Sequence, residues 1–174
     1  MAVFVALLRA INVGGTGKLA MRELVTLCEA AGFTKVKTYI QSGNVLFESR
    51  LGEAKVKGKL EQLLAAKLGK PFDVLLRSAA ELEAVLLHNP FKQAAPSRVL
   101  VLFLNEAPAK NALANLVVPA NEEVKLHGRE VFIHYPDGMG RSKLKLPLVA
   151  TATGRNLNTV SKLAAMAREA AITR

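Results

Sequence analysis

A glycine-rich stretch near the N-terminus has the composition of an anion-binding loop. It runs from Arg9 to Lys18, contains Asn12 and three glycines between residues 14 and 17, and lies between an apolar segment and a helical pattern. A loop that opens a helix presents backbone N–H groups and the positive end of the helix dipole, to which the two cations add charge. We therefore expect Arg9, Asn12 and Lys18 to bind an anionic group.

This stretch differs from the nucleotide-binding P-loop at two positions. Asn12 stands where the first glycine of GxxxxGK[ST] would fall, and Leu19 replaces the hydroxyl residue that holds magnesium. ATP hydrolysis by this route is therefore excluded. The alternative that the glycines only shape a turn stays open.

Two further loops combine cationic and amide side chains. One follows the last predicted hairpin and the other precedes the last predicted helix. A helix cap explains one asparagine of the second loop, but it explains neither the arginine nor the other asparagine. An arginine beside amides suits a phosphate, a carboxylate or a base edge. The candidate residues of these loops are Arg141, Ser142, Lys143, Arg155, Asn156 and Asn158.

A predicted hairpin adds hydroxyl and amide groups. A tight turn at residues 42–44 joins two strands, and Tyr39, Ser42 and Asn44 lie at or beside it. We expect these three residues to complete the binding site.

The residues offer no catalytic or metal-binding set. The three histidines show no metal-ligand spacing, and Cys28 lies on the apolar stripe of a helix, where a core role is expected. Acidic residues are scarce in the candidate loops, which argues against paired carboxylates or a two-metal site. We expect no cofactor and no metal, name no catalytic residue, and leave open whether the protein is an enzyme.

Apolar periodicity predicts the elements that position these loops. Val3–Leu8 and Val99–Leu104 are apolar on both faces, which is typical of central strands covered on both sides. Residues 1–78 follow the order strand, helix, strand, strand, helix, strand, which is that of a ferredoxin-like unit.

The rest of the chain repeats this order in part. We expect a linking helix and loop over residues 79–97. Residues 98–174 then form strand, helix, strand, strand, helix, with Leu113, Leu116 and Val117 on the first of these helices. The sequence therefore predicts an α+β fold of two ferredoxin-like half-domains, 1–78 and 98–174, packed into one compact body.

Composition limits the class of protein. The chain has 174 residues, of which 51% are hydrophobic, and no apolar run approaches the roughly 20 residues that span a bilayer. The N-terminus is expected to be a strand, not a signal peptide, so we expect a cytoplasmic protein with no membrane partner. The net charge of +10 favours polyanionic partners, and residues 125–174 hold nine Lys/Arg against three Asp/Glu.

Four segments resemble a family of uncharacterised bacterial proteins, the domain of unknown function 1697 family. They are Leu8–Gly15, Thr38–Val45, Gly140–Leu144 and Ala152–Val160. The resemblance implies paired ferredoxin-like halves and no established activity.

The chain departs from the family pattern in three places. Ala10 stands where a glycine is usual, and Leu157 stands where a tryptophan is usual, which removes an aromatic platform. Only Lys145–Ala152, with Pro147 inside, separates the last two motifs, so the helix usually found there is expected to be shortened.

Three functions remain open. The first is a binding module for a phosphate-bearing ligand, either nucleic acid or a phosphorylated small molecule. The second is an enzyme or sensor for a small anionic metabolite, with Arg9, Lys18 and Arg155 as clamps and Tyr39 or Ser42 handling protons. The third is a structural or oligomeric protein with an incidental basic surface. The first two readings predict that the candidate loops converge on one cleft between the halves, and the oligomeric state stays open.

Overall fold

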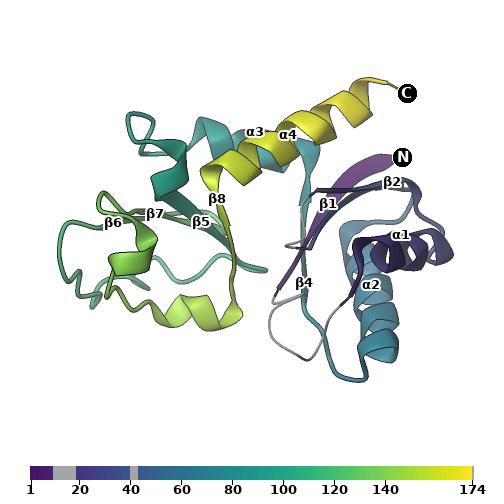
Figure 1. Ribbon diagram of the computed structural model, residues 1–174, viewed down its shortest axis with the longest axis horizontal. Coiled ribbons are helices and arrows are strands. Elements are labelled where there is room, and N and C mark those ends of the chain that lie inside the picture. The colour runs from purple at the N-terminus through teal and green to yellow at the C-terminus, as the bar shows by residue number, and fades with distance from the viewer. Residues whose placement is uncertain (10–18, 40–42, 174) are drawn as a thin grey trace. The chain divides into compact units, whose positions relative to one another are not determined.

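The computed structural model describes residues 1–9, 19–39 and 43–173, which form two four-stranded antiparallel sheets and four α-helices (Figure 1). The chain divides into two compact units. Unit 1 is Met1–Leu82 with Leu163–Arg174, and unit 2 is Glu83–Lys162. Two helices, α3 (Ala79–Leu87) and α4 (Leu157–Ile172), contribute residues to both units.

The first sheet lies in unit 1, with strand order β2-β3-β1-β4. Its strands are β1 (Ala2–Leu8), β2 (Thr34–Tyr39), β3 (Asn44–Ser49) and β4 (Val74–Ser78). Ala6 pairs with Val45 on one side and Leu76 on the other, so β1 is a central strand. Every residue from Val3 to Leu8 is buried. The predicted buried central strand at Val3–Leu8 is therefore confirmed.

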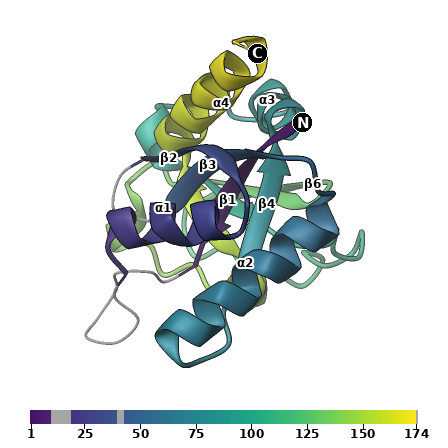
Figure 2. The ribbon, with the colours of Figure 1, turned by 90° about the vertical axis from the view of Figure 1, so that its right-hand side faces the viewer.

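Two helices cover one face of this sheet. Figure 2 shows α1 (Met21–Ala30) and α2 (Glu53–Leu68) in front of the strands. Between helices and sheet lies a core in which the rings of Phe33 and Phe47 stack with centroids 4.4 Å apart. Cys28 of α1 belongs to this core and is fully buried, as its position on the apolar stripe predicts.

A helix cap fixes the start of α3. The Ser78 N–H donates to Oε2 of Glu81 at 2.8 Å, and the Glu81 N–H donates to Oγ of Ser78 at 3.1 Å. This reciprocal pair satisfies two backbone donors of the first turn. The linking helix expected within residues 79–97 is therefore present.

The second sheet lies in unit 2, with strand order β6-β7-β5-β8, so the central and edge strands fall at the same positions as in the first. Its strands are β5 (Val99–Phe103), β6 (Glu123–His127), β7 (Glu130–His134) and β8 (Thr153–Asn156). Leu102 pairs with Val131 of β7 and Gly154 of β8, which confirms the predicted central strand. Three 3-10 helices complete the unit: η1 (Pro96–Arg98), η2 (Met139–Arg141) and η3 (Pro147–Thr151).

The α-helix predicted around Leu113, Leu116 and Val117 is wrong. This part of the chain forms consecutive turns with i to i+3 hydrogen bonds, such as the Leu116 N–H to the carbonyl of Leu113 at 3.1 Å. Leu113 and Leu116 are three residues apart and both pack on the unit 2 core, so tight turns bury them without an α-helix. Asn115 and the β-branched Val117 also lower helix propensity here.

Strand β8 corrects a second expectation, because its residues were predicted to form a loop. Gly154 and Asn156 are poor strand formers, and pairing with β5 overrides that preference. A Cβ on Gly154 would stand 3.2 Å from Cδ2 of Leu102 and 3.3 Å from Cδ1 of Leu100. Close packing on β5 therefore explains the glycine.

Candidate functional site

The structure describes three of the six candidate residues that lie between residues 9 and 44. Asn12, Lys18 and Ser42 lie outside the described residues. Arg9 follows β1, and Tyr39 and Asn44 form the adjacent ends of β2 and β3. Because Leu7 pairs with Asn44, these three residues lie at the same end of the first sheet.

Asn44 has a structural task at this end of the sheet. Its side chain is fully buried, and Nδ2 donates to the Tyr39 carbonyl at 3.0 Å. Beside it, Gly43 has a φ of +81°, and its carbonyl accepts the Leu8 N–H at 2.9 Å. The left-handed φ explains the glycine in this turn. The hairpin is thereby tied to β1, with the half-buried Arg9 next along the chain.

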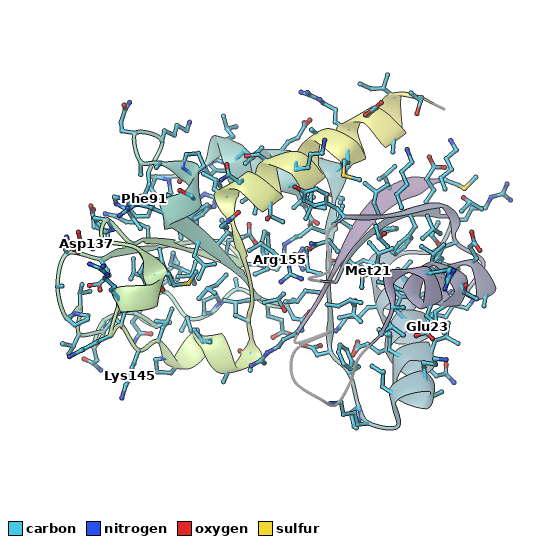
Figure 3. All side chains as sticks on the ribbon, in the orientation of Figure 1. Met21, Glu23, Phe91, Asp137, Lys145 and Arg155 are labelled. Carbon is cyan, nitrogen blue, oxygen red and sulfur yellow. The ribbon has the colours of Figure 1, made fainter. Side chains whose placement is uncertain are left out.

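Arg155 and Asn156 lie at the junction of β8 and α4. Burial lowers the pKa of Arg155 to about 10, because a desolvated guanidinium favours its neutral form. Oδ1 of Asn156 accepts the Thr159 N–H at 2.9 Å, which is the capping bond expected for one asparagine. Asn158 is exposed in the first turn of α4. Figure 3 shows Arg155 beside β8.

A second arginine, which the candidate set omits, occupies the matching position in unit 1. Arg77 lies opposite Val5 in the first sheet, and Arg155 lies opposite Val101 in the second. In both, Nη1 donates to the carbonyl of the preceding residue at 2.9 Å, and the next residue caps a helix. Arg77 is only 1% exposed. An arginine inside an otherwise apolar strand is the sequence signal that could have identified it.

The loop after β7 holds its cations outward. We call Arg141–Lys145 the basic segment. Within it, Leu144 packs on the unit 2 core, while Arg141, Lys143 and Lys145 are exposed. Figure 3 shows Lys145 on the outer side of its segment. These three cations form no ion pair with any residue that the structure describes.

Ser142 anchors the basic segment to the start of the β6–β7 hairpin. Its Oγ donates to Oε1 of Glu122 at 2.6 Å and accepts the Leu144 N–H at 3.1 Å. The hydrogen bond from Ser142 is the main cause that lowers the pKa of Glu122 below its ordinary value. Glu122 was not a candidate, because its partner lies 20 residues away and no spacing signals the pair.

Glu122 and Ser142 line a cavity of about 240 Å³ with Tyr135, Asp137 and Arg141. Burial is the main cause that raises the pKa of Tyr135, and the Glu122 carboxylate adds to it. Asp137 accepts a hydrogen bond from Nδ2 of Asn121 at 2.9 Å. The polar groups of this cavity therefore bond mainly to one another.

A larger groove of about 450 Å³ lies beside the lysines, and we call it the lysine groove. Its cations are Lys143 and Lys145, and no acidic residue lines it. Its other lining residues include Asn115, Leu116, Val117, Pro119 and Pro147. An apolar groove with a few polar groups at its margin has the composition of a small-ligand site.

The histidines and Cys28 are further titratable side chains in the described part of the chain. Among the described residues there is no group of three or more His, Cys, Asp and Glu side chains that could hold an ion. The rings of His88 and His127 stack at 4.2 Å, and His134 packs against Phe91 at 5.5 Å. Burial raises the pKa of the Cys28 thiol to about 12, which makes it a poor nucleophile. No helix in the described ranges is long and apolar enough to span a bilayer.

The single-cleft prediction joins residues of both units, and it stays a prediction. What the structure does bring together is Arg9, Tyr39 and Asn44 in unit 1. In unit 2 it brings Lys143 and Lys145 to the lysine groove, while Arg141 lines the smaller cavity with Glu122 and Ser142.

The comparisons with known proteins identify a family of unknown function. None of the curated proteins matches the chain. A solved structure, that of a conserved bacterial protein from Streptococcus pneumoniae, is similar at 28% identity with a TM-score of 0.81, covering 95% of this chain and 98% of that one. Residues 1–132 match the family described as protein of unknown function, DUF1697, and the basic segment lies beyond that match. The chain therefore belongs to the DUF1697 family.

Proposed function

We propose that the protein binds a phosphate-bearing polyanion, nucleic acid foremost, through the basic segment of unit 2. The observation that carries this proposal is the exposure of three cations within five residues, Arg141 at the end of η2 and Lys143 and Lys145 just after it, all without an ion-pair partner among the described residues. After η2, Lys143 and Lys145 are exposed while Leu144 and Leu146 pack on the core of unit 2, so these two lysines face solvent along the same stretch.

Local packing supports a fixed presentation of these charges. Leu144 and Leu146 are held in the core of unit 2, and Ser142 is bonded to Glu122. Like charges held close together repel, and an external anion would relieve that repulsion. A row of phosphates supplies negative charges at repeated spacing, which suits a row of cations.

The end of the first sheet is a second part of this proposal. Arg9, Tyr39 and Asn44 lie together there, and we extend the proposed anion site to Asn12, Lys18 and Ser42 of the adjoining loops. In unit 2 we include Asn158, which is exposed in the first turn of α4. We assign the desolvated Arg155 and the capping Asn156 a supporting part in holding that turn.

We also infer that each sheet derives from a ferredoxin-like half. The shared strand order of the two sheets supports this description, with a central first strand and an edge second strand in each. Unit 2 departs from the pattern because turns replace the helix between β5 and β6. Folds of this type serve many functions, so the fold by itself does not favour a ligand.

The test compares two triple variants that remove the same charge. The first variant removes the three positive charges of the basic segment by Arg141→Gln, Lys143→Gln and Lys145→Gln. The matched control, Lys37→Gln with Lys55→Gln and Lys70→Gln, removes three exposed lysines of unit 1. Binding of a short fluorescent oligonucleotide is followed by anisotropy at low salt.

We expect the first variant to bind about tenfold more weakly or worse, because each lost phosphate contact removes counterion release. The control should bind nearly as well as the original protein. Equal losses in both variants, or no binding by the original protein, would contradict the proposal. Circular dichroism checks that both variants fold.

A further inference from the structure

The lysine groove has two chemically different surfaces. Lys143 and Lys145 supply charge, while Leu116, Val117 and Pro147 supply apolar walls. Val117 is 79% exposed, so its apolar surface is available to a ligand in the groove. A ligand that consists only of phosphates would use the lysines and leave the apolar walls in water.

The groove therefore favours a ligand with an apolar body next to its phosphate. A nucleotide has this composition, and the groove volume of about 450 Å³ lies in the range of small-ligand sites. The flat faces of a base can lie between apolar side chains, as they do where enzymes hold an extruded base. The Asn115 amide offers both a donor and an acceptor for a base edge.

We infer that the lysine groove receives an unpaired base of single-stranded nucleic acid whose flanking phosphates contact Lys143 and Lys145. This inference rests on the proposed function and narrows it from polyanions in general to single strands. In a duplex the base faces are stacked and the edges are paired, so the apolar walls gain nothing from it. The groove lining contains no carboxylate, so the ligand must supply the negative charge that pairs with the two lysines.

The first experiment varies the bases at constant strand length. Full-length protein is titrated with a short oligodeoxythymidine, with an abasic oligonucleotide of the same length, and with the thymidine strand annealed to its complement. We expect the oligodeoxythymidine to bind about five- to tenfold more tightly than the abasic strand, since removing the faces of one base from water against apolar walls has an effect of this order. The duplex should bind less tightly than the oligodeoxythymidine, although it carries more charge.

The second experiment changes the wall and leaves the charge intact. Val117→Asn places a polar amide on the groove, and Val149→Asn makes the same change at a 48% exposed valine of unit 2 outside the groove lining. Val117→Asn should weaken the binding of oligodeoxythymidine about fivefold and leave the binding of the abasic strand unchanged. Val149→Asn should change neither, and thermal melting confirms that both variants fold.

The outcomes separate this inference from the proposed function. Equal affinity for the oligodeoxythymidine and abasic strands, or no effect of Val117→Asn, overturns the base site while salt-dependent polyanion binding still stands. Tighter binding of an acidic, valine-rich peptide than of the oligodeoxythymidine also overturns it and assigns the groove to a protein partner. If the original protein binds none of these oligonucleotides, the proposed function itself is refuted.

Discussion

At the scale of single residues, hydrogen bonding decides what a polar side chain can do. Ser142 and Asn156 both qualified as ligand-binding candidates, and both are engaged within unit 2. The Ser142 hydroxyl donates to Glu122 and accepts a backbone N–H, so its donor and one lone pair are in use. Its contribution is to hold the basic segment in place.

Replacing this hydroxyl should change the titration of its partner. In Ser142→Ala, the pKa of Glu122 should rise toward the ordinary value of 4.5, because the main hydrogen bond that favours the carboxylate is gone. A carboxyl whose folded pKa is depressed stabilises the fold above its ordinary pKa, and that stabilisation disappears as the pH falls through the depressed value. The variant should therefore lose less stability on acidification than the original protein.

Carbon-13 NMR titration of the glutamate side chains measures this shift directly. Ser161→Ala, which removes an exposed hydroxyl of α4, serves as the control and should leave Glu122 unchanged. An unaltered Glu122 pKa in Ser142→Ala would mean that the backbone donors alone set it.

Residue roles were predictable where they depend on local sequence. The capping role of Asn156 follows from its place before a helical pattern, and the core position of Cys28 follows from helical spacing. The Glu122–Ser142 pair depends on how the chain folds back over 20 residues, so no local pattern contains it. The position of Arg155 on a strand likewise depends on pairing with β5.

At the scale of elements, periodicity succeeded where packing and local preference agree. Strands β1 and β5 and helices α1 and α2 have clear patterns, and all four are present. The two wrong predictions fall on segments where packing and local preference disagree. Tight turns partly bury Leu113 and Leu116, and the glycine-containing β8 pairs with β5. The confirmed elements are those for which local preference and packing predict the same structure. Tertiary contacts determine the structure of the other two segments.

One glycine lies inside helix α2 and another directly follows it, and the two should respond to alanine in opposite directions. Gly58 lies in the interior of the helix with open space where a Cβ would stand, so Gly58→Ala should stabilise the fold by about 0.5–1 kcal/mol. Gly69 follows the helix with a φ of +75°, and its N–H donates to the Ala65 carbonyl at 2.8 Å. Gly69→Ala should destabilise by about 1 kcal/mol, because a Cβ disfavours the left-handed conformation.

Urea unfolding of the two variants measures both changes, and each variant is the control for the other. A common gain in stability would show that Gly69 does not need its left-handed conformation. A common loss would show that the interior of α2 has no room at Gly58.

At the scale of the whole molecule, the question is whether net charge or local arrangement governs polyanion binding. Unit 1 holds fourteen Lys/Arg and eight Asp/Glu, and unit 2 holds ten and six, so both units are basic. Net charge draws any polyanion toward the protein. Tight contacts require cations that are exposed and free of acidic partners, as Arg141, Lys143 and Lys145 are among the described residues.

The salt dependence of oligonucleotide binding distinguishes the two mechanisms. For single strands, each neutralised phosphate contributes about −0.7 to the slope of log K against log salt concentration. Contacts limited to the three cations of the basic segment predict a slope of about −2, whereas engagement of a charge equal to the net +10 would give about −7. We expect a value much nearer the shallower one, to which Arg9 and Lys18 of the proposed unit 1 site add about −1.4. Neutralising the basic segment by Arg141→Gln, Lys143→Gln and Lys145→Gln should therefore make the slope shallower by about 2. The Lys37→Gln, Lys55→Gln and Lys70→Gln control should keep the slope of the original protein, although both variants lose the same charge. Anisotropy titrations across a series of salt concentrations give these slopes. A steep slope that falls equally in both variants would assign binding to the diffuse charge of the whole molecule, and the basic segment would then have no special part in it.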